Sequence, residues 1–419
     1  MTNAKPVSAV ILGAGNRGMG YASFAQAHPH RLKIVGVAEP RPYHRNFIAT
    51  THGLAPQQAT HDWRDLAARP RFADAVIIAT QDAMHVEPAV AFARQGYAIL
   101  LEKPMAPDLA GCEAIVQAVK ENGNLFAVCH VMRYTAYTQA VKQIVDSGVL
   151  GEIVSIQHLE PVGFWHQAHS FVRGNWRNQA QSTFMLLAKS CHDLDWIYYI
   201  LGKPCRSISS FGSLRHFRRS EKPPQAGDAI RCVDCAHEPA CPYSAPRIYL
   251  TRLAAGITGW PVNVLAPDAT VDSVTQALRT GPYGRCVYEC DNDVVDNQVV
   301  NMQFDGGETA VFTMTAFSEA DHRQTRLFGT HGMLTGDGVA IQHFDFLSEQ
   351  TQVIAAPAPD TGILSGHGGG DYALIDRFVA AVAQNDPSLI LSGADESHES
   401  HRLVFAAEQA RLENRVVNL

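Results

Sequence analysis

Residues 7–18 read VSAVILGAGNRG, a β-rich apolar run that leads directly into a glycine turn. The turn fits G-x-G-x-x-G between a strand and a helical stretch, the context in which this pattern binds a dinucleotide. Its glycines permit a tight turn, a close approach to the pyrophosphate and close packing of helix on strand. The alternative is a glycine turn that binds no cofactor. The residues predicted to bind the cofactor here are Gly13, Gly15, Asn16, Arg17 and Gly18.

Four more apolar runs follow the glycine turn and alternate with helical stretches. They are LKIVGVAEP (32–40), ADAVIIATQ (73–81), YAILLEKP (97–104) and NLFAVCH (124–130). Continuous apolar runs are typical of strands buried on both faces of a parallel sheet. We therefore predict an α/β fold that begins with a doubly wound parallel sheet, a Rossmann domain over residues 1–128.

The pattern changes after about Gly151, where strands become longer and partly alternating. VVNMQF (299–304) and ETAVFTM (308–314) are joined by Asp-Gly-Gly, which indicates an antiparallel hairpin. Two amphipathic helices are expected near the C-terminus, over 371–384 and 395–412. The sequence predicts a second, α+β domain over residues 129–419 with an antiparallel or mixed sheet.

Bulk properties restrict the class of partner and compartment. The 419 residues exceed the usual size of one core, and a net charge of −7 gives no general attraction to nucleic acid or anionic lipid. The basic stretch from Lys203 to Lys222 is interpreted as a solvated loop. No apolar run approaches the roughly 18 residues of a membrane span, and the chain enters a strand too early for a signal peptide. We expect a cytoplasmic protein without nucleic-acid or membrane partners.

Glu39 ends the second predicted strand, 21 residues after Gly18. An acid at about this spacing hydrogen-bonds the ribose 2′-hydroxyl of NAD and repels the 2′-phosphate of NADP. Arg41 and Arg45 lie just beyond and are able to pair with such a phosphate, which keeps NADP as the alternative. The sequence predicts NAD.

Two further segments carry polar residues suited to acid–base chemistry. An apolar strand stops at Glu102-Lys103-Pro104, and KSCHDLD (189–195) places Lys189, His192 and Asp195 on one face if it is helical. Hydride removal from a secondary alcohol needs a base for the hydroxyl proton and a cation near the forming carbonyl, and histidine and lysine supply both. The alternatives are an ordinary strand-end lysine and a core histidine.

These segments resemble the Gfo/Idh/MocA oxidoreductases in order and spacing over nearly the whole chain. The resemblance rests on GAGNRG, ATQDAMHVEPAVAFARQGYAILLEKPMA, VMRY, GVLGEI, GNWRN and KSCHDLD. It implies a C-terminal domain with a large open, mostly antiparallel sheet, often used for oligomerisation, here in a homodimer or homotetramer. It also implies that Lys103 and His192 are the active-site lysine and histidine. Further cofactor contacts are expected at Thr80, His85, Glu102 and Lys103.

One departure from the family pattern affects the substrate. The usual aspartate four residues before the histidine is Ala188 here, Ser190 stands where glycine is usual, and Asp195 keeps the later acid. We therefore infer no particular substrate from the family resemblance. Trp176 offers a stacking face to a sugar ring and Arg177 a fork for hydroxyls or a carboxylate, although this loop is equally suited to a subunit contact. The predicted substrate residues are Trp176, Arg177, Lys189 and Asp195.

A cysteine-rich insertion is expected around residues 214–290. Cys232, Cys235 and Cys241 form a CxxC pair with a third cysteine six residues on, a pattern typical of structural zinc. Cys286 is predicted as the fourth ligand, with Cys290 or His237 as alternatives. The other interpretation is three reduced cysteines in a loop.

The leading functional hypothesis is an NAD-dependent dehydrogenase acting on a carbohydrate or cyclic polyol. The second is an enzyme that retains its NAD and oxidises a sugar carbon transiently, so that hydrolysis, epimerisation or isomerisation follows before the hydride returns. The third is a nucleotide-sensing protein without catalysis, which the lysine and histidine argue against because a sensor needs no acid–base pair.

Overall fold

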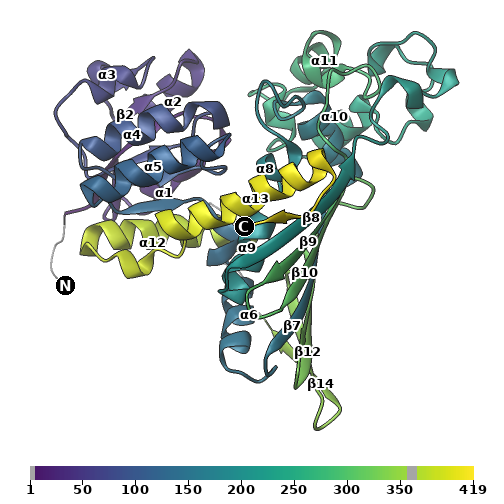
Figure 1. Ribbon diagram of the computed structural model, residues 1–419. Coiled ribbons are helices and arrows are strands. Elements are labelled where there is room, and N and C mark those ends of the chain that lie inside the picture. Colours follow the sequence, from purple (N-terminus) through teal and green to yellow (C-terminus); the bar gives the residue numbers. More distant parts are fainter. Residues whose placement is uncertain (1–4, 356–365) are drawn as a thin grey trace.

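The computed structural model describes residues 5–355 and 366–419, which form two sheets joined by long helices (Figure 1). The first sheet has six parallel strands in the order β3-β2-β1-β4-β5-β6. Its strands are β1 Val7–Leu12, β2 Leu32–Ala38, β3 Ala59–Thr60, β4 Ala75–Ile78, β5 Ala98–Leu101 and β6 Phe126–Val128. The Rossmann prediction is confirmed. The two-residue strand β3 was not predicted because it is too short to show a pattern.

Helices cover both faces of this sheet, which explains its continuous apolar strands. The helices of this region are α1 Asn16–Ala27, α2 Pro42–His52, α3 Arg64–Ala67, α4 Val86–Arg94 and α5 Leu109–Asn122. On one face Phe24 of α1 packs with Ile11 and Ile77 of the sheet. On the other face Phe92 of α4 and Ile115 of α5 pack against the opposite side chains of the same strands.

The second sheet has nine strands in the order β14-β13-β12-β11-β7-β10-β9-β8-β15. It is mixed, since β7 and β10 pair in parallel and the other neighbours are antiparallel. The predicted hairpin is β9–β10, with Met302 opposite Ala310. The strands are β7 Ile153–Pro161, β8 Cys205–Ser213, β9 Asn297–Phe304, β10 Thr309–Thr315, β11 Gln324–Gly329, β12 Gly332–Gly336, β13 Ala340–Asp345, β14 Gln350–Ala355 and β15 Val417–Asn418.

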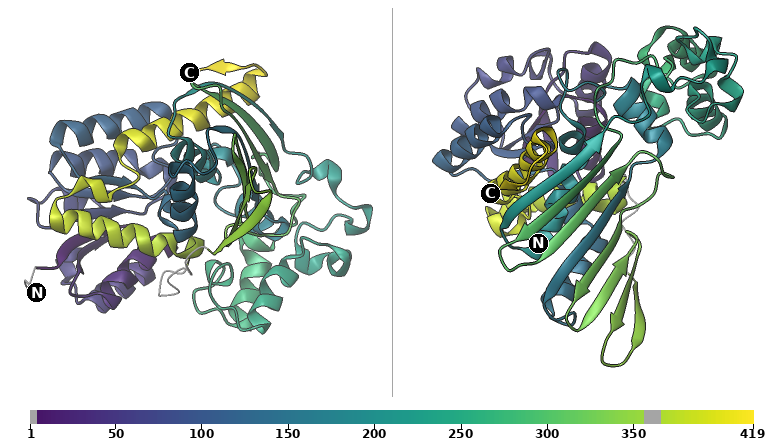
Figure 2. Two further views of the ribbon diagram at one scale, coloured as in Figure 1. Left: turned by 90° about the horizontal axis from the view of Figure 1, so that it is seen from below. Right: turned by 45° about the vertical axis from the view of Figure 1, so that its right-hand side comes forward.

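Within residues 5–355 and 366–419, helices cover only one face of the second sheet, as the right-hand view of Figure 2 shows. Ile156, Val300 and Phe312 point into this covered side and are fully buried. The helices against it are α6 Ala136–Asp146, α8 Met185–Ala188, α9 Cys191–Leu201 and α13 Ala394–Glu413. The alternation of buried and half-exposed residues along β10 follows from this one-sided burial.

The insertion around 214–290 is largely helical and lies at one end of the second sheet (Figure 1). It contains α10 Ala245–Ala254 and α11 Val271–Thr280 and has a core of its own around Phe217, Tyr249 and Leu278. A short helix, α7 Phe164–His166, runs into a π-helix over Gln167–Arg173 beside it.

Both predicted C-terminal helices are confirmed, as α12 Gly370–Gln384 and α13. Leu374 and Phe378 of α12 pack on the Rossmann sheet, so the chain returns to the first sheet before α13 covers the second. Within the described residues, no helix is both long and apolar enough to cross a membrane.

Candidate functional site

The glycine turn lies between β1 and α1, where backbone crowding requires two of its glycines. Gly13 has φ +85°, and a Cβ there would lie 2.4 Å from the carbonyl oxygen of Ala79. A Cβ on Gly18 would lie 2.0 Å from the carbonyl oxygen of Gly13. Gly15 precedes α1, whose first turn begins at Asn16 and presents backbone N–H groups to an anion. This turn fits the pyrophosphate of a dinucleotide.

The Glu39 carboxylate is buried directly below the turn and accepts three kinds of hydrogen bond. The Ala14 N–H donates at 2.7 Å, the Arg41 N–H at 2.9 Å and the Arg41 guanidinium at 2.7 and 3.0 Å. Burial raises the pKa of Glu39, but these hydrogen bonds outweigh burial and the pKa is lowered. The acid is therefore ionised at the end of β2, with its charge balanced by Arg41.

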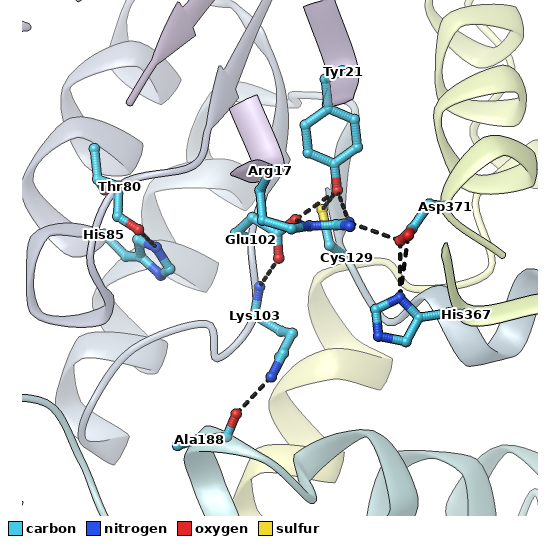
Figure 3. A network of polar contacts seen from close by, with 10 residues as sticks. All are labelled: Arg17, Tyr21, Thr80, His85, Glu102, Lys103, Cys129, Ala188, His367 and Asp371. Carbon is cyan, nitrogen blue, oxygen red and sulfur yellow. Dashed lines mark hydrogen bonds and ion pairs between the residues drawn. The ribbon is translucent and has the colours of Figure 1, made fainter. Parts of the chain in front are cut away.

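Arg17 links the glycine turn to two other parts of the chain (Figure 3). Its Nε lies 2.5 Å from Glu102 at the end of β5, and its Nη2 lies 2.8 Å from Asp371 in the first turn of α12. The Tyr21 hydroxyl donates to the same Glu102 oxygen at 2.6 Å. Asp371 in turn lies against His367, 3.1 Å from its Nδ1. No sequence pattern connects Arg17 with residues 367–371, because only the tertiary fold brings them together.

Lys103 follows Glu102 and points away from it, toward the second sheet's helices. Its Nζ donates to the carbonyl oxygen of Ala188, at 2.6 Å, so the strand end of the Rossmann sheet meets the end of α8 here (Figure 3). The cis peptide bond to Pro104 follows. The carbonyl oxygen of Pro104 lies 2.8 Å from Nδ1 of the fully buried His85, whose Nε2 is 3.4 Å from the Thr80 carbonyl oxygen.

His192 lies in the first turn of α9 and is buried close to Lys103. Burial is the largest cause that lowers the pKa of His192 well below its ordinary value, and the charge of Lys103 and the neighbouring His130 and His367 add to it. Its ring centroid is 5.9 Å from that of His130 and 5.8 Å from that of His367. Among the described residues, none hydrogen-bonds its Nδ1. His192 is therefore a neutral imidazole, the form that accepts a proton.

The predicted single helical face of Lys189, His192 and Asp195 is wrong. α8 ends at Ala188 and α9 begins at Cys191, so Lys189 and Ser190 form a break between two helices. Lys189 instead reaches Glu160 of β7, with its Nζ 3.0 Å from the carboxylate.

Glu160 belongs to a buried ionic network that the sequence did not reveal. Arg323 lies 2.5 Å from Glu160 and 2.9 Å from Asp193, and His158 lies 3.1 Å from Asp193. Arg323 is 17% exposed in its side chain, and the acids on either side raise its pKa against the effect of burial. Lys189 is held in this network by its ion pair with Glu160.

Asp195 is held by Arg133, which lies in the segment that follows β6. Both of its oxygens accept hydrogen bonds from the Arg133 guanidinium, at 2.8 and 2.7 Å, and both side chains are almost completely buried. Arg133 also donates to the carbonyl oxygen of Leu391, just before α13. Both oxygens of Asp195 are therefore paired with Arg133, and the role of Asp195 toward substrate stays a prediction.

Trp176 and Arg177 lie side by side in the loop after the π-helix but have different partners. The Trp176 indole N–H donates to Asp82 of the Rossmann domain at 3.2 Å, which places Trp176 between the two domains. The Arg177 guanidinium forms a two-pronged pair with Asp291 at 2.8 and 3.1 Å. Substrate binding by either residue stays a prediction.

The predicted zinc site is not supported. Cys232, Cys235, Cys241 and Cys286 do line one small cavity, together with His237. However, no three histidine, cysteine, aspartate or glutamate side chains within 5–355 and 366–419 are arranged to hold a metal ion. The cavity is also lined by the buried Arg173, whose Nη2 lies 3.3 Å from the Cys232 sulfur. The guanidinium cation of Arg173 therefore lies beside the Cys232 sulfur, where it would repel a metal cation.

The sequence matches two family models that together cover most of the chain. The family model described as "Oxidoreductase family, NAD-binding Rossmann fold" matches residues 7–130, and "Oxidoreductase family, C-terminal alpha/beta domain" matches residues 142–419. A relative from Bacillus subtilis named "Putative oxidoreductase YteT" is 22% identical over 77% of this chain and 76% of its own length.

Other relatives match over shorter stretches, and this chain spans less than two thirds of their length. Levoglucosan dehydrogenase of Pseudarthrobacter phenanthrenivorans is 26% identical over 53% of this chain and 56% of its own. The 2,7-anhydro-N-acetylneuraminate hydratase of Escherichia coli is 28% identical over 35% and 39%.

Among solved structures, levoglucosan dehydrogenase in complex with NADH and levoglucosan shares the fold. Its TM-score is 0.70 at 18% identity, and the alignment covers 99% of both chains. Since the two family models together match most of the sequence, the chain belongs to the Gfo/Idh/MocA family and is an NAD-binding oxidoreductase.

Proposed function

We propose that the protein is an NAD-dependent dehydrogenase that oxidises a secondary alcohol of a sugar or cyclic polyol. The observation that carries the proposal is the pair of Lys103 and the neutral, buried His192 at the carboxyl end of β5, the edge where ligands bind in open α/β sheets. The names of the levoglucosan and inositol dehydrogenases among the relatives support this substrate class.

The bound cofactor would be held by the glycine turn and Glu39 and would accept the hydride. His192 would accept the hydroxyl proton, because its lowered pKa keeps it unprotonated near neutral pH. Lys103 would place a cation beside the forming carbonyl oxygen. The roles of the two residues are exchangeable in principle, and the neutrality of His192 is what favours this division.

NAD is proposed over NADP because Glu39 is ionised and buried at the end of β2. Arg41, which is already paired with Glu39, does not then offer an unbalanced charge to a 2′-phosphate. Lys189, Trp176 and Arg177 are proposed as residues that line the substrate side of the site.

The test is a panel of levoglucosan, myo-inositol, scyllo-inositol and aldohexoses with NAD⁺, followed by absorbance of NADH. The expected result is NADH formation with at least one member, at a rate that saturates with that sugar and is lower with NADP⁺. Absence of NADH with every member, while NAD⁺ binding is measurable by calorimetry, would contradict a net dehydrogenase.

We also propose that the protein is a homodimer or homotetramer formed through the uncovered face of the nine-stranded sheet. Leu159, Val311 and Phe328 alternate with residues of the covered face and therefore lie on the open one. A shallow hollow of about 560 Å³ lies over this face, lined by Leu159 and Val311. A second copy of the same face would bury these apolar side chains.

A further inference from the structure

A histidine stands in a strained turn immediately before α12. His367 has φ 50° and ψ 42°, and the next two residues, Gly368 and Gly369, also have positive φ of 60° and 83°. A left-handed conformation is uncommon for any residue with a Cβ, and such strain collects at functional sites. The turn brings the imidazole of His367 beside His192, with ring centroids 5.8 Å apart.

Asp371, one helical turn later, orients this histidine. Its Oδ2 lies 3.1 Å and its Oδ1 3.3 Å from Nδ1 of His367. The carboxylate is almost completely buried, and Arg17 of the glycine turn lies 2.8 Å from its Oδ1 (Figure 3). Burial raises the pKa of Asp371, but the hydrogen bond from His367 and the charge of Arg17 outweigh burial and hold it low. The aspartate is therefore a fixed anion.

A carboxylate on Nδ1 keeps a proton on that nitrogen and leaves Nε2 for proton transfer, as in other aspartate–histidine pairs. The charged or titratable groups around His367 are Asp371 on α12, Arg17 on α1 and His192 on α9. The imidazole is 39% exposed, so it is open to a molecule in the site, whereas Asp371 behind it is not.

Hydride transfer from an alcohol does not require this pair. That step releases one hydride and one proton, and His192 with Lys103 already supplies the base and the cation. A second base next to the first is required only if a second proton is removed. The acidic proton then available is the one on the carbon beside the new carbonyl.

We propose that His367, oriented by Asp371, is a second general base that removes this α-proton, so that the protein catalyses epimerisation or elimination of its sugar as well as oxidation. The inference rests on the proposed function, because the α-proton becomes acidic only after the alcohol is oxidised. It assigns His367 as a catalytic residue and Asp371 as a positioning residue.

The step balances on the substrate itself. The α C–H bond breaks, the proton goes to Nε2 of His367, and the electron pair forms a C=C bond while the carbonyl oxygen becomes an enolate beside Lys103. A proton from solvent water then adds to the opposite face, while His367 releases its proton to solvent, and this gives the epimer. Alternatively the bond to an oxygen substituent on the next carbon breaks, the π-electrons re-form the carbonyl with a new C=C bond, and the leaving oxygen takes the proton from His367. Return of the hydride to the carbonyl carbon then leaves no net oxidation.

The test is deuterium exchange in D₂O with NAD⁺ and the sugars of the panel, measured by mass spectrometry alongside NADH absorbance. Wild type is expected to incorporate solvent deuterium at the carbon next to the oxidised one. H367Q should lower the rate of incorporation about 10²-fold relative to the rate of NADH formation. H30Q, at an exposed histidine elsewhere in the Rossmann domain, is the matched control and should leave the ratio unchanged.

Asp371 needs a separate readout, since a positioning residue acts through His367. D371N should lower exchange and also weaken the preference of the His367 ring for the Nδ1–H tautomer, measured by NMR of ¹⁵N-labelled histidine without substrate. D376N on the same helix, where the native aspartate pairs with Arg31, is the matched control.

These outcomes separate the two proposals. NADH formation without deuterium incorporation in wild type would overturn the second base while leaving the dehydrogenase standing. Equal loss of exchange and NADH formation in H367Q would also overturn it, because His367 would then serve the hydride step. If no sugar of the panel gives NADH, the dehydrogenase proposal fails on its own test. The NMR measurement still tests the pair: an identical tautomer of His367 in wild type and D371N would overturn it.

Discussion

At the residue scale, the state of His192 follows from its surroundings. Burial, the Lys103 cation and two further histidines all disfavour the imidazolium, so the pKa of His192 is lowered. A base with a lowered pKa is unprotonated over the whole neutral range and loses its function only in acid. The acidic limb of kcat/KM is therefore expected below the ordinary histidine pKa of about 6.5.

The contribution of Lys103 to this pKa is testable without turnover. In K103M the cation is gone while the length is kept, so the imidazolium is less disfavoured and the pKa of His192 should rise. NMR titration of the His192 ring in both proteins measures the shift. A pKa that is unchanged or lower in K103M would show that Lys103 does not act on His192 through its charge.

The same variant tests the role of Lys103 in chemistry. Loss of a positioned acid, base or cation typically costs about 10²–10⁴-fold in rate, so turnover by K103M should fall by that order. The affinity for NAD⁺, measured by calorimetry, should change little, because the glycine turn and Glu39 are intact. Lys33, an exposed lysine of β2, is the control position, and K33M should keep normal turnover.

Glu39 should govern the choice of dinucleotide. In E39A the ribose loses its acceptor and Arg41 loses its partner, which frees a guanidinium for a 2′-phosphate. The ratio of kcat/KM for NAD⁺ over NADP⁺ should fall by at least about tenfold, which corresponds to roughly 1.4 kcal/mol. A wild-type protein that prefers NADP⁺ would instead assign the choice to Arg41 or Arg45.

At the scale of elements, the buried pair Arg133–Asp195 fixes how α9 packs. It connects the turn after β6 with α9 and, through the Leu391 carbonyl oxygen, with the approach to α13. Removing one partner of a buried pair leaves the other charge without compensation and typically costs about 3–5 kcal/mol. R133M should therefore lower the free energy of unfolding by this amount in urea denaturation.

The pH dependence of this pair has a definite sign. Burial raises the pKa of Asp195, but the charge of Arg133 outweighs it and the pKa is lowered. The stabilisation is present above the ordinary aspartate pKa and is lost as the pH falls through the lowered value, so the deficit of R133M should be complete at pH 7. K142M removes a partly exposed pair with Asp146 and should cost less than about 1 kcal/mol. Equal losses in the two variants would mean that burial does not set the cost.

At the scale of the whole molecule, one sheet binds the cofactor and the other presents an uncovered face. L159E places a charge at the centre of that face and should shift the protein from oligomer to monomer in light scattering coupled to gel filtration. V271E is the control, because Val271 is an exposed apolar residue at the start of α11, away from the sheet. A wild-type protein that is monomeric, or an L159E oligomer of unchanged mass, would exclude this interface.

Much of the architecture can be predicted from local sequence patterns. Continuous apolar strands, the glycine turn before α1, the hairpin β9–β10 and the amphipathic C-terminal helices each depend on neighbours in the chain or on simple periodicity, and each is present in the structure. The residues at the strand end, Glu102 and Lys103, were found because parallel strands place their carboxyl ends at a ligand. The boundary near residue 128 stays a prediction, since α12 packs on the Rossmann sheet although it follows the second one.

The features that the sequence did not predict depend on contacts between distant residues. The break between α8 and α9 directs Lys189 to Glu160, and helical spacing alone did not show it. The cysteines line one cavity as their spacing suggested, but the buried Arg173 from another segment occupies the space beside Cys232. The link from Arg17 through Asp371 to His367 spans 350 positions of the chain. Charge pairing inside a protein depends on which surfaces meet in the fold. Sequence spacing does not show which charged residues become partners when they are far apart in the chain.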